Sequence, residues 1–298
     1  MFKKRQFQFA CFLAVVLPLL GVLVLMILAF ADKSFGHAEA ITCFVMFVIT
    51  LIGIEIGYHR LFSHKAFQTF WPLRLMFGIF GCMAVQGSVL WWSGVHRTHH
   101  QHTDTPDDPH SPLDGFLHAH FLWLFSDSVN PENWTRRIKD LYGDPVVAIL
   151  HRYYLVFAVL GFLIPAAILG LHSGSWTGVI NGALWGGLVR MFLVNHVIWS
   201  INSICHAFGS RRYKTRDTSR NNYWLMVLSL GFSLHNNHHA SPKSATNQHM
   251  WWEIDLCGLL IQSLALAKLV WNVSTPSEQL LSRRSIRSES SHWEKESQ

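Results

Sequence analysis

Eight histidines fall into three short clusters along the chain. The clusters read HRLFSH from His59 to His64, HRTHH from His96 to His100, and HNNHH from His235 to His239. Imidazole nitrogen binds iron, copper, nickel and zinc alike, so the residue types do not name the metal. A tetrahedral zinc site takes four ligands, often including cysteine, and eight imidazoles overfill it. The clusters therefore predict two metal ions.

The spacing within the clusters indicates how the helices around them must run. Residues three and four apart share a helix face, so the second and third clusters, if helical, should each aim three imidazoles at one point. The two triplets are His96, His99 and His100, and His235, His238 and His239. His59 and His64 are five apart, and one continuous α-helix would separate them. The helix that carries them is predicted to end or bend near Leu61.

The stretch INSICH offers a further ligand. Asn202 and His206 are four residues apart, so on a helix they point the same way. His206 could bind a metal, and Asn202 could hold a metal-bound water. Alternatively, the two side chains satisfy a polar helix end by hydrogen bonding.

Carboxylates commonly orient metal-bound imidazoles. Five acidic residues near the clusters are candidates, and each could equally be a solvated surface charge: Asp104, Asp107, Asp108, Glu253 and Asp255. Glu55 is a more specific candidate because it lies one turn before His59 in an apolar segment. A charge there is costly and usually functional.

The composition predicts a membrane protein. Half of the 298 residues are hydrophobic and only 14% are charged. Four apolar stretches approach the length of about 20 residues that a spanning helix needs; they cover roughly 9–31, 38–57, 151–171 and 178–200. The first also resembles a signal peptide, but its apolar run exceeds the usual ~7–15 residues. We therefore expect an all-α integral membrane fold with four transmembrane helices.

Charge predicts the orientation, because basic residues concentrate in cytoplasmic segments. With Lys3, Lys4 and Arg5 inside, the loops near 32–37 and 172–177 fall outside. Lys33 is the one lysine or arginine in these two loops. Both termini and all three histidine clusters are then cytoplasmic, the clusters in a helical cap that carries a dimetal centre. The net charge of +6 fits attraction to anionic membrane lipid, and nucleic acid is not an expected partner.

The remaining segments give a simple domain organisation. Residues 1–273 are predicted to form one membrane domain, and 274–298 a polar, disordered tail. The stretch near 75–92 is expected to form one interfacial or buried helix, and 256–270 an amphipathic helix on the membrane surface.

From about His59 to Leu256 the chain resembles the membrane fatty acyl desaturases of the stearoyl-CoA desaturase type. The resemblance rests on HRLFSH, WWSGVHRTHH, DPH at residues 108–110 with GF and His120 after it, INSICH, HNNHH and WWEID. It implies a non-haem diiron centre whose ligands are the eight clustered histidines and His206, with Asn202 contacting a metal-bound water. It also implies that O2 oxidises a saturated acyl chain to a cis-alkene, typically at the ninth carbon.

This implied chemistry needs no catalytic acid or base beyond the diiron centre. A saturated methylene has no acidic proton, so the metal cofactor must activate the oxidant. No haem, flavin or iron–sulfur motif is visible in the sequence. Electrons are therefore expected from a separate cytoplasmic donor of the ferredoxin, rubredoxin or cytochrome type.

Two departures from the family pattern concern the metal centre and the acyl carrier. Phe232 stands where relatives commonly have Glu, whereas Glu55 stands where they usually have a small or hydroxyl residue; our hypothesis is that Glu55 has taken over the missing role. Animal acyl-CoA desaturases also carry charged residues that meet CoA where this chain has Gly94-Val95 and Leu113-Asp114. Acyl-CoA remains the first expectation, with acyl lipid or acyl carrier protein next.

Two other functions are compatible with the pattern. One is a related three-cluster diiron hydroxylase of alkanes, sterols or carotenoids, which product analysis would distinguish. The other is a membrane protein that binds or transports metal. The second is disfavoured because the clusters lie at one face of the membrane. A transport pathway would need polar residues along the apolar segments, and these segments offer no such series.

Overall fold

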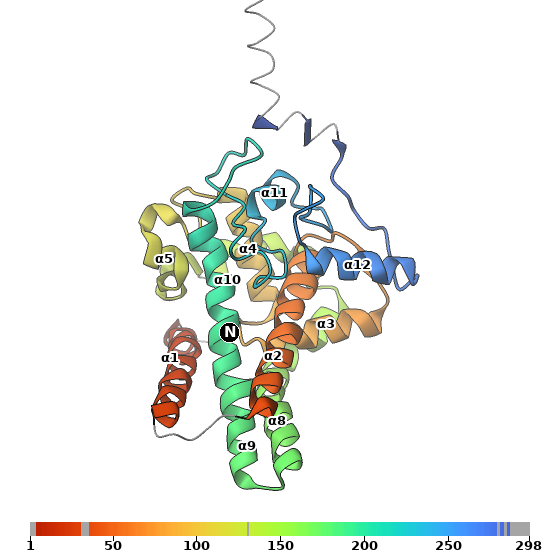
Figure 1. Ribbon diagram of the computed structural model, residues 1–298. Coiled ribbons are helices and arrows are strands. Elements are labelled where there is room, and N and C mark those ends of the chain that lie inside the picture. Colours follow the sequence, from red (N-terminus) through yellow and green to blue (C-terminus); the bar gives the residue numbers. More distant parts are fainter. Residues whose placement is uncertain (1–3, 31–35, 130, 279–280, 283–284, 287–298) are drawn as a thin grey trace, which may run out of the picture.

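The computed structural model describes residues 4–30, 36–129, 131–278, 281–282 and 285–286. Long helices run side by side, and a cap of shorter helices and loops covers one end of them (Figure 1). Lys3 and Lys33, which entered the charge argument, and most of the predicted tail lie outside the described residues. Of that tail, Ser285 forms a bridge with Tyr213 in the cap.

Four segments are long and apolar enough to cross a membrane, as predicted. They are Gln8–Leu28, His37–Ser63, Tyr154–Ser173 and Trp176–Ala207. The first lies in α1 (Lys4–Phe30) and the third is α8 (Tyr154–Ser173). The second joins α2 (His37–Ile52) to a π-helix, η1 (Gly53–Ser63), and the fourth joins α9 (Trp176–Gly182), the π-helix η6 (Ala183–Val189) and α10 (Arg190–Ala207).

The second and fourth spans run further than the sequence predicted. Their apolar runs weaken near 57 and 200, but the helices continue through buried polar residues into the cap. The second span is predicted to end or bend near Leu61, and it does end close to that residue, because η1 stops at Ser63. In the π-helical part of the second span the backbone hydrogen bonds join residues i and i+5.

The stretch near 75–92 forms two helices rather than one. α3 (Trp71–Met83) ends before Val85 and Gly87, which have φ of 61° and 86°, and α4 (Val89–His102) begins after them. α3 and α12 (Leu256–Leu266) both run across the direction of the long helices (Figure 1). The break turns the chain from α3 into the cap, so that α4 carries the second histidine cluster there.

A short antiparallel pair is the exception to the all-α prediction. β1 (Gln68–Thr69) pairs with β2 (Val270–Trp271), which follows α12. The pairing holds the end of α12 against the chain that leaves η1. The predicted helix over 256–270 therefore stops at Leu266.

Short helices complete the cap and its junction with the long helices. They are η2 (Pro112–Asp114), α5 (Phe116–His120), η3 (Leu122–Phe125), η4 (Asp127–Val129), α6 (Pro131–Trp134), η5 (Thr135–Leu141), α7 (Pro145–Arg152) and α11 (His235–Ala240). The largest buried apolar cluster includes residues of η1, α3, α4, α7 and α10. It therefore joins the cap to the spans.

Arg190 is a buried cation within the fourth span. Its guanidinium donates to the carbonyl oxygens of Met83, Gly161 and Gly186 at 2.8–3.0 Å. Because Met83 ends α3, the cation meets the negative end of that helix dipole. The arginine thus fixes the end of α3 between two spans.

Gly53 is where η1 and α3 approach most closely. A Cβ there would lie 2.2 Å from backbone atoms of Phe80 and Gly81. We expect Gly53→Ala to cost about 1–3 kcal/mol of stability through overpacking and to lower the melting temperature of the detergent-solubilised protein. Gly143→Ala is the matched control, since a Cβ there meets nothing within 4 Å. Equal melting temperatures for the two variants would contradict this packing.

Candidate metal centre

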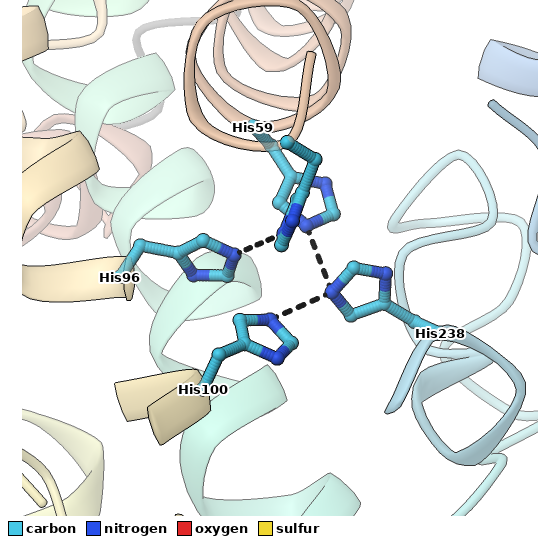
Figure 2. A group of neighbouring side chains, drawn as sticks. His59, His96, His100 and His238 are labelled. Carbon is cyan, nitrogen blue, oxygen red and sulfur yellow. Dashed lines mark hydrogen bonds between the residues drawn. The ribbon is translucent and has the colours of Figure 1, made fainter. Parts of the chain in front are cut away.

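Nine buried or half-buried histidines gather in two groups within the cap. The ligand atoms of each group lie within 4.8 Å of one another. One group contains His59, His64, His96, His100 and His238, and the other contains His99, His206, His235 and His239. Figure 2 shows four rings of the first group, from η1, α4 and α11, pointing toward a common centre. These are the nine histidines that the sequence singled out.

The π-helix explains how His59 and His64 reach the same group. The amide of His64 donates to the carbonyl of His59 at 3.0 Å, an i→i+5 contact. With this wider turn, residues five apart lie near one face instead of being splayed. The H-x4-H spacing therefore suits a π-helix.

The prediction that each triplet aims at one point is wrong. On α4, His96 and His100 belong to the five-histidine group and His99 to the other. An α-helix turns about 100° per residue, so positions i and i+4 nearly coincide in direction while adjacent positions diverge. α11 divides its histidines in the same way, with His238 in one group and the other two in the second. Each helix thus serves both groups.

The nitrogen atoms within the groups lie unusually close. Nε2 of His238 is 3.1 Å from Nε2 of His59 and 2.9 Å from that of His100. The Nε2 atoms of His64 and His96 are 2.8 Å apart, and those of His206 and His235 are 3.0 Å apart. One proton on His238 Nε2 could satisfy only one of its two neighbours. The other contact would bring two lone pairs together.

Four carboxylates contact the opposite nitrogen, Nδ1, of four of these rings. The pairs are Glu55 with His59 at 2.7 Å, Asp104 with His206 at 3.0 Å, Asp108 with His99 at 3.0 Å, and Asp217 with His239 at 2.9 Å. Two of these contacts, Asp108 with His99 and Asp217 with His239, are hydrogen bonds. An ionised carboxylate only accepts hydrogen bonds, so Nδ1 of these two rings carries the proton and Nε2 keeps its lone pair. This arrangement presents imidazole lone pairs to the middle of the four-histidine group.

These residues fit metal ions. Ligands about 2.1 Å from one ion lie about 3 Å from each other, which matches the spacing of the Nε2 atoms. The Nε2 atoms of His99 and His239 are buried without a hydrogen-bond partner among the described residues. A cation in each group would relieve the lone-pair repulsion and satisfy these atoms. Each group could therefore hold one metal ion.

Burial keeps most of the imidazoles neutral, which is their ligating form. It lowers the pKa of several rings well below the ordinary value, namely those of His64, His96, His100, His235 and His238. Burial also disfavours the charged form of His99, but Asp108 outweighs it and raises the pKa of that ring. The same contact overcomes burial of Asp108 and holds its pKa below the usual range.

The remaining residues that the sequence suggested as partners of the metal centre are three carboxylates and Asn202. Asp107 is 81% exposed and lies 3.8 Å from His102. Glu253 accepts a hydrogen bond from Asn237, and Asp255 is paired with Arg60. None of these three carboxylates contacts one of the nine histidines within the described chain. Asn202 is half-buried on α10, one turn before His206, and its role toward a metal-bound water stays a prediction.

His110 does not create a third independent site. It lies with His99 and Asp108 in a small buried group, but Nδ1 of His99 is already engaged by Asp108. The remaining nitrogen of His99 belongs to the four-histidine group.

Sequence reasoning missed Asp217. This residue lies in the loop between α10 and α11, and its carboxylate accepts from Thr215, Ser219 and His239. It stands at no helical spacing from any cluster, so periodicity could not identify it. The polar run around it, TRDTS, was the only available signal.

A buried ionic chain supports His59. Arg60 donates to Glu55 at 2.6 Å and to Asp255 at 2.9 Å, and all three side chains are nearly inaccessible. The ring of Phe232 lies 4.5 Å from the ring of His59, centroid to centroid. Glu55 and Phe232 therefore touch the same imidazole. This geometry supports the hypothesis that Glu55 fulfils the role of the glutamate that relatives commonly have at position 232.

The sequence matches known proteins along most of its length. The family model for fatty acid desaturases matches residues 37–255. The chain is 40% identical to hex-5-enoyl-[acyl-carrier protein] acetylenase of Moorena producens, over 81% of this chain and 78% of that protein. It is 37% identical to the sn-1 stearoyl-lipid 9-desaturase of Anabaena variabilis (85% and 90%) and 32% identical to acyl-CoA desaturase 1 of Saccharomyces cerevisiae (80% and 46%).

The chain belongs to the fatty acid desaturase family. The expectation drawn from the histidine clusters is thereby confirmed at the level of the family. The desaturase is an oxidoreductase of lipid metabolism, with four candidate membrane spans and two histidine groups suited to metal.

The carboxylate that the sequence did not reveal gives a direct test. Asp217→Asn should weaken metal binding about 10–100-fold, the usual effect of losing a group that orients a metal-bound histidine. Asp107→Asn is the matched control, because Asp107 is largely exposed. Metal content after dialysis against graded chelator measures the effect. Equal metal retention in both variants would show that Asp217 does not orient His239.

Glu55 gives a second test. Glu55→Gln should reduce metal retention and turnover because the amide no longer balances the Nδ1–H of His59 or the guanidinium of Arg60. Adding Phe232→Glu should restore part of both, since position 232 adjoins the same ring. Unchanged metal content and turnover in Glu55→Gln would end the hypothesis.

Proposed function

We propose that this desaturase inserts a cis double bond at the ninth carbon of a saturated fatty acyl chain. It uses O2, two electrons and two protons, and releases two waters. The observation that carries the proposal is the division of nine histidines into groups of five and four, each suited to one iron ion. The sidedness is part of the proposal, with the cap and both termini in the cytoplasm.

The iron ions supply the oxidising chemistry that removes hydrogen from an unactivated methylene. The nine imidazoles would hold the ions, and four carboxylates orient four of the rings by contacting Nδ1. Asn202 would hold a water at the four-histidine group, which has one protein ligand fewer. Because almost all of these side chains are buried, the cap excludes solvent from the reacting site.

The acyl carrier is inferred from the positions at which animal acyl-CoA desaturases carry residues that meet CoA. Gly94 packs against Trp134, and a Cβ there would lie 2.4 Å from the indole ring. Leu113 is exposed, and Asp114 lies 3.6 Å from His118. No basic side chain stands at these positions to meet a nucleotide phosphate. We therefore place acyl lipid or acyl carrier protein ahead of the acyl-CoA that the sequence favoured first.

A second candidate reaction is the oxidation of an alkene to an alkyne. It is favoured by the 40% identity to a protein described as an acetylenase. The same metal centre would serve, because both reactions remove two hydrogens from adjacent carbons. A diiron hydroxylase remains the other alternative, and it would leave oxygen in the product.

Fatty-acid profiling tests the reaction. Expression in a host that lacks Δ9 desaturation should give a new cis-monoene, located by mass spectrometry at the ninth carbon. His99→Ala should abolish it, because one metal ion loses a ligand, whereas His172→Ala, an exposed residue near the far end of α8, should not. A hydroxylated product without a new double bond would refute the desaturase proposal, and an alkyne would favour the second candidate.

A comparison of carriers tests the substrate. The purified enzyme is supplied with stearoyl groups on phospholipid, on acyl carrier protein and on CoA, with a chemical reductant. We expect turnover of the CoA form to be at least tenfold lower than that of the better of the other two. A preference for stearoyl-CoA would contradict the inference from Gly94 and Trp134.

A further inference from the structure

A cavity of about 720 Å³ lies in the cap beside α4, and the proposed reaction gives it no role. Its walls include Arg97, Gln101 and His102 from α4, and Asn133, Arg136 and Arg137 from the segment α6–η5. None of the nine histidines lines it. The cavity is therefore separate from the metal centre.

The cavity and the metal centre lie on opposite sides of α4. At about 100° per residue, the directions of residues 96, 99 and 100 cluster on one face, and those of residues 97, 98, 101 and 102 cluster on the other. The first set belongs to the histidine groups and the second set lines the cavity. One helix, about 10–12 Å across with its side chains, thus separates the cavity from the ligands.

The charge of the cavity is positive. Three arginines and one aspartate, Asp107, line it. Arg97 is paired with Asp140, which Lys65 shares, and it also donates to the carbonyls of Phe62 and Ser63. These contacts make Arg97 a fixed part of the wall.

Arg136 and Arg137 are the cations best placed to meet a partner. Arg136 is exposed. Arg137 contacts His102 at 2.9 Å, and its Nε is buried without a hydrogen-bond partner among the described residues. A partner with surface carboxylates would meet both cations. Such complementarity increases the rate of encounter and orients weak complexes.

We propose that this cavity is the docking site of an acidic, one-electron carrier protein that reduces the metal centre through α4. The proposal rests on the proposed function, which needs two electrons that the acyl chain and O2 do not supply. Two reduced carriers, one O2, two protons and R–CH2–CH2–R′ give two oxidised carriers, R–CH=CH–R′ and two waters. Redox partners typically associate through small and transient interfaces, and a charged cavity of this size is compatible with such an interface.

The test uses the full-length, iron-loaded enzyme in lipid nanodiscs and reduced plant-type [2Fe–2S] ferredoxin as the probe. Under anaerobic conditions, the oxidation of ferredoxin by the oxidised enzyme is followed by stopped-flow absorbance. Arg136→Glu should lower the second-order rate constant about tenfold at low salt and flatten its salt dependence. Iron content and the rate of reduction by dithionite should not change, because Arg136 contacts none of the nine histidines.

Lys243→Glu is the matched control, since Lys243 is exposed and does not line the cavity. It should leave the rate with ferredoxin near the wild-type value. Equal rates in both variants, or no oxidation of ferredoxin by the wild type, would overturn the docking proposal. So would a rise in KM for stearoyl-acyl carrier protein in Arg136→Glu with an unchanged ferredoxin rate, because the cavity would then receive the acyl carrier.

Failure of the proposed function has a different signature. In that case the wild type would accept electrons from ferredoxin and yet form no alkene from any stearoyl carrier, even with dithionite. Electron transfer and alkene formation are measured separately, so each result bears on one proposal.

Discussion

The structure depends on bringing the ligand nitrogens of nine histidines together in two groups, within 4.8 Å of one another in each. The Nε2 atoms of several of these rings lie 2.8–3.1 Å apart, and His238 has two such neighbours, of which one proton could satisfy only one. Holding such groups together needs rigid supports from several directions. Two continuous spans, one cap helix that crosses between the groups and one short helix supply them. The spans thus do more than anchor the protein, because the ends of two of them carry His59, His64 and His206.

The buried ions at the end of the second span illustrate how the framework resists strain. Arg60 follows His59 directly, and its guanidinium is held by Glu55, by Asp255 and by the carbonyl of Ala245. Asp255 also caps α12 by accepting from the amide of Gly258. A buried pair of this kind costs desolvation and gives little net stability, but removing one partner is strongly destabilising. The network therefore fixes the geometry of η1 against α12.

Much of this centre could be predicted from the sequence, because ligand identity follows from residue type and spacing. All nine histidines come together, and Glu55, Asp104 and Asp108 contact three of them. The π-helix could not be predicted, since residues 53–63 look like the end of an ordinary apolar helix. The division of each triplet between two groups also escaped, because helical periodicity gives directions within one helix and says nothing about a second centre on its flank. Asp217 could not be identified from the sequence, because only the path of the long loop between α10 and α11 brings it to His239.

The carboxylates around the centre are unequally distributed, and this has an electrostatic consequence. If each group binds a divalent ion, as proposed, neutral imidazole ligands would not compensate the charge of the two ions. The four carboxylates that contact the far side of the rings would then supply compensating charge, and three of them, Asp104, Asp108 and Asp217, contact the four-histidine group. The fourth, Glu55, serves the other group and is shared with Arg60. At equal distance, more negative charge stabilises the more oxidised state of an ion. If each group binds an iron ion, as proposed, the four-histidine group, which also has one protein ligand fewer, is the group whose carboxylates better balance additional positive charge.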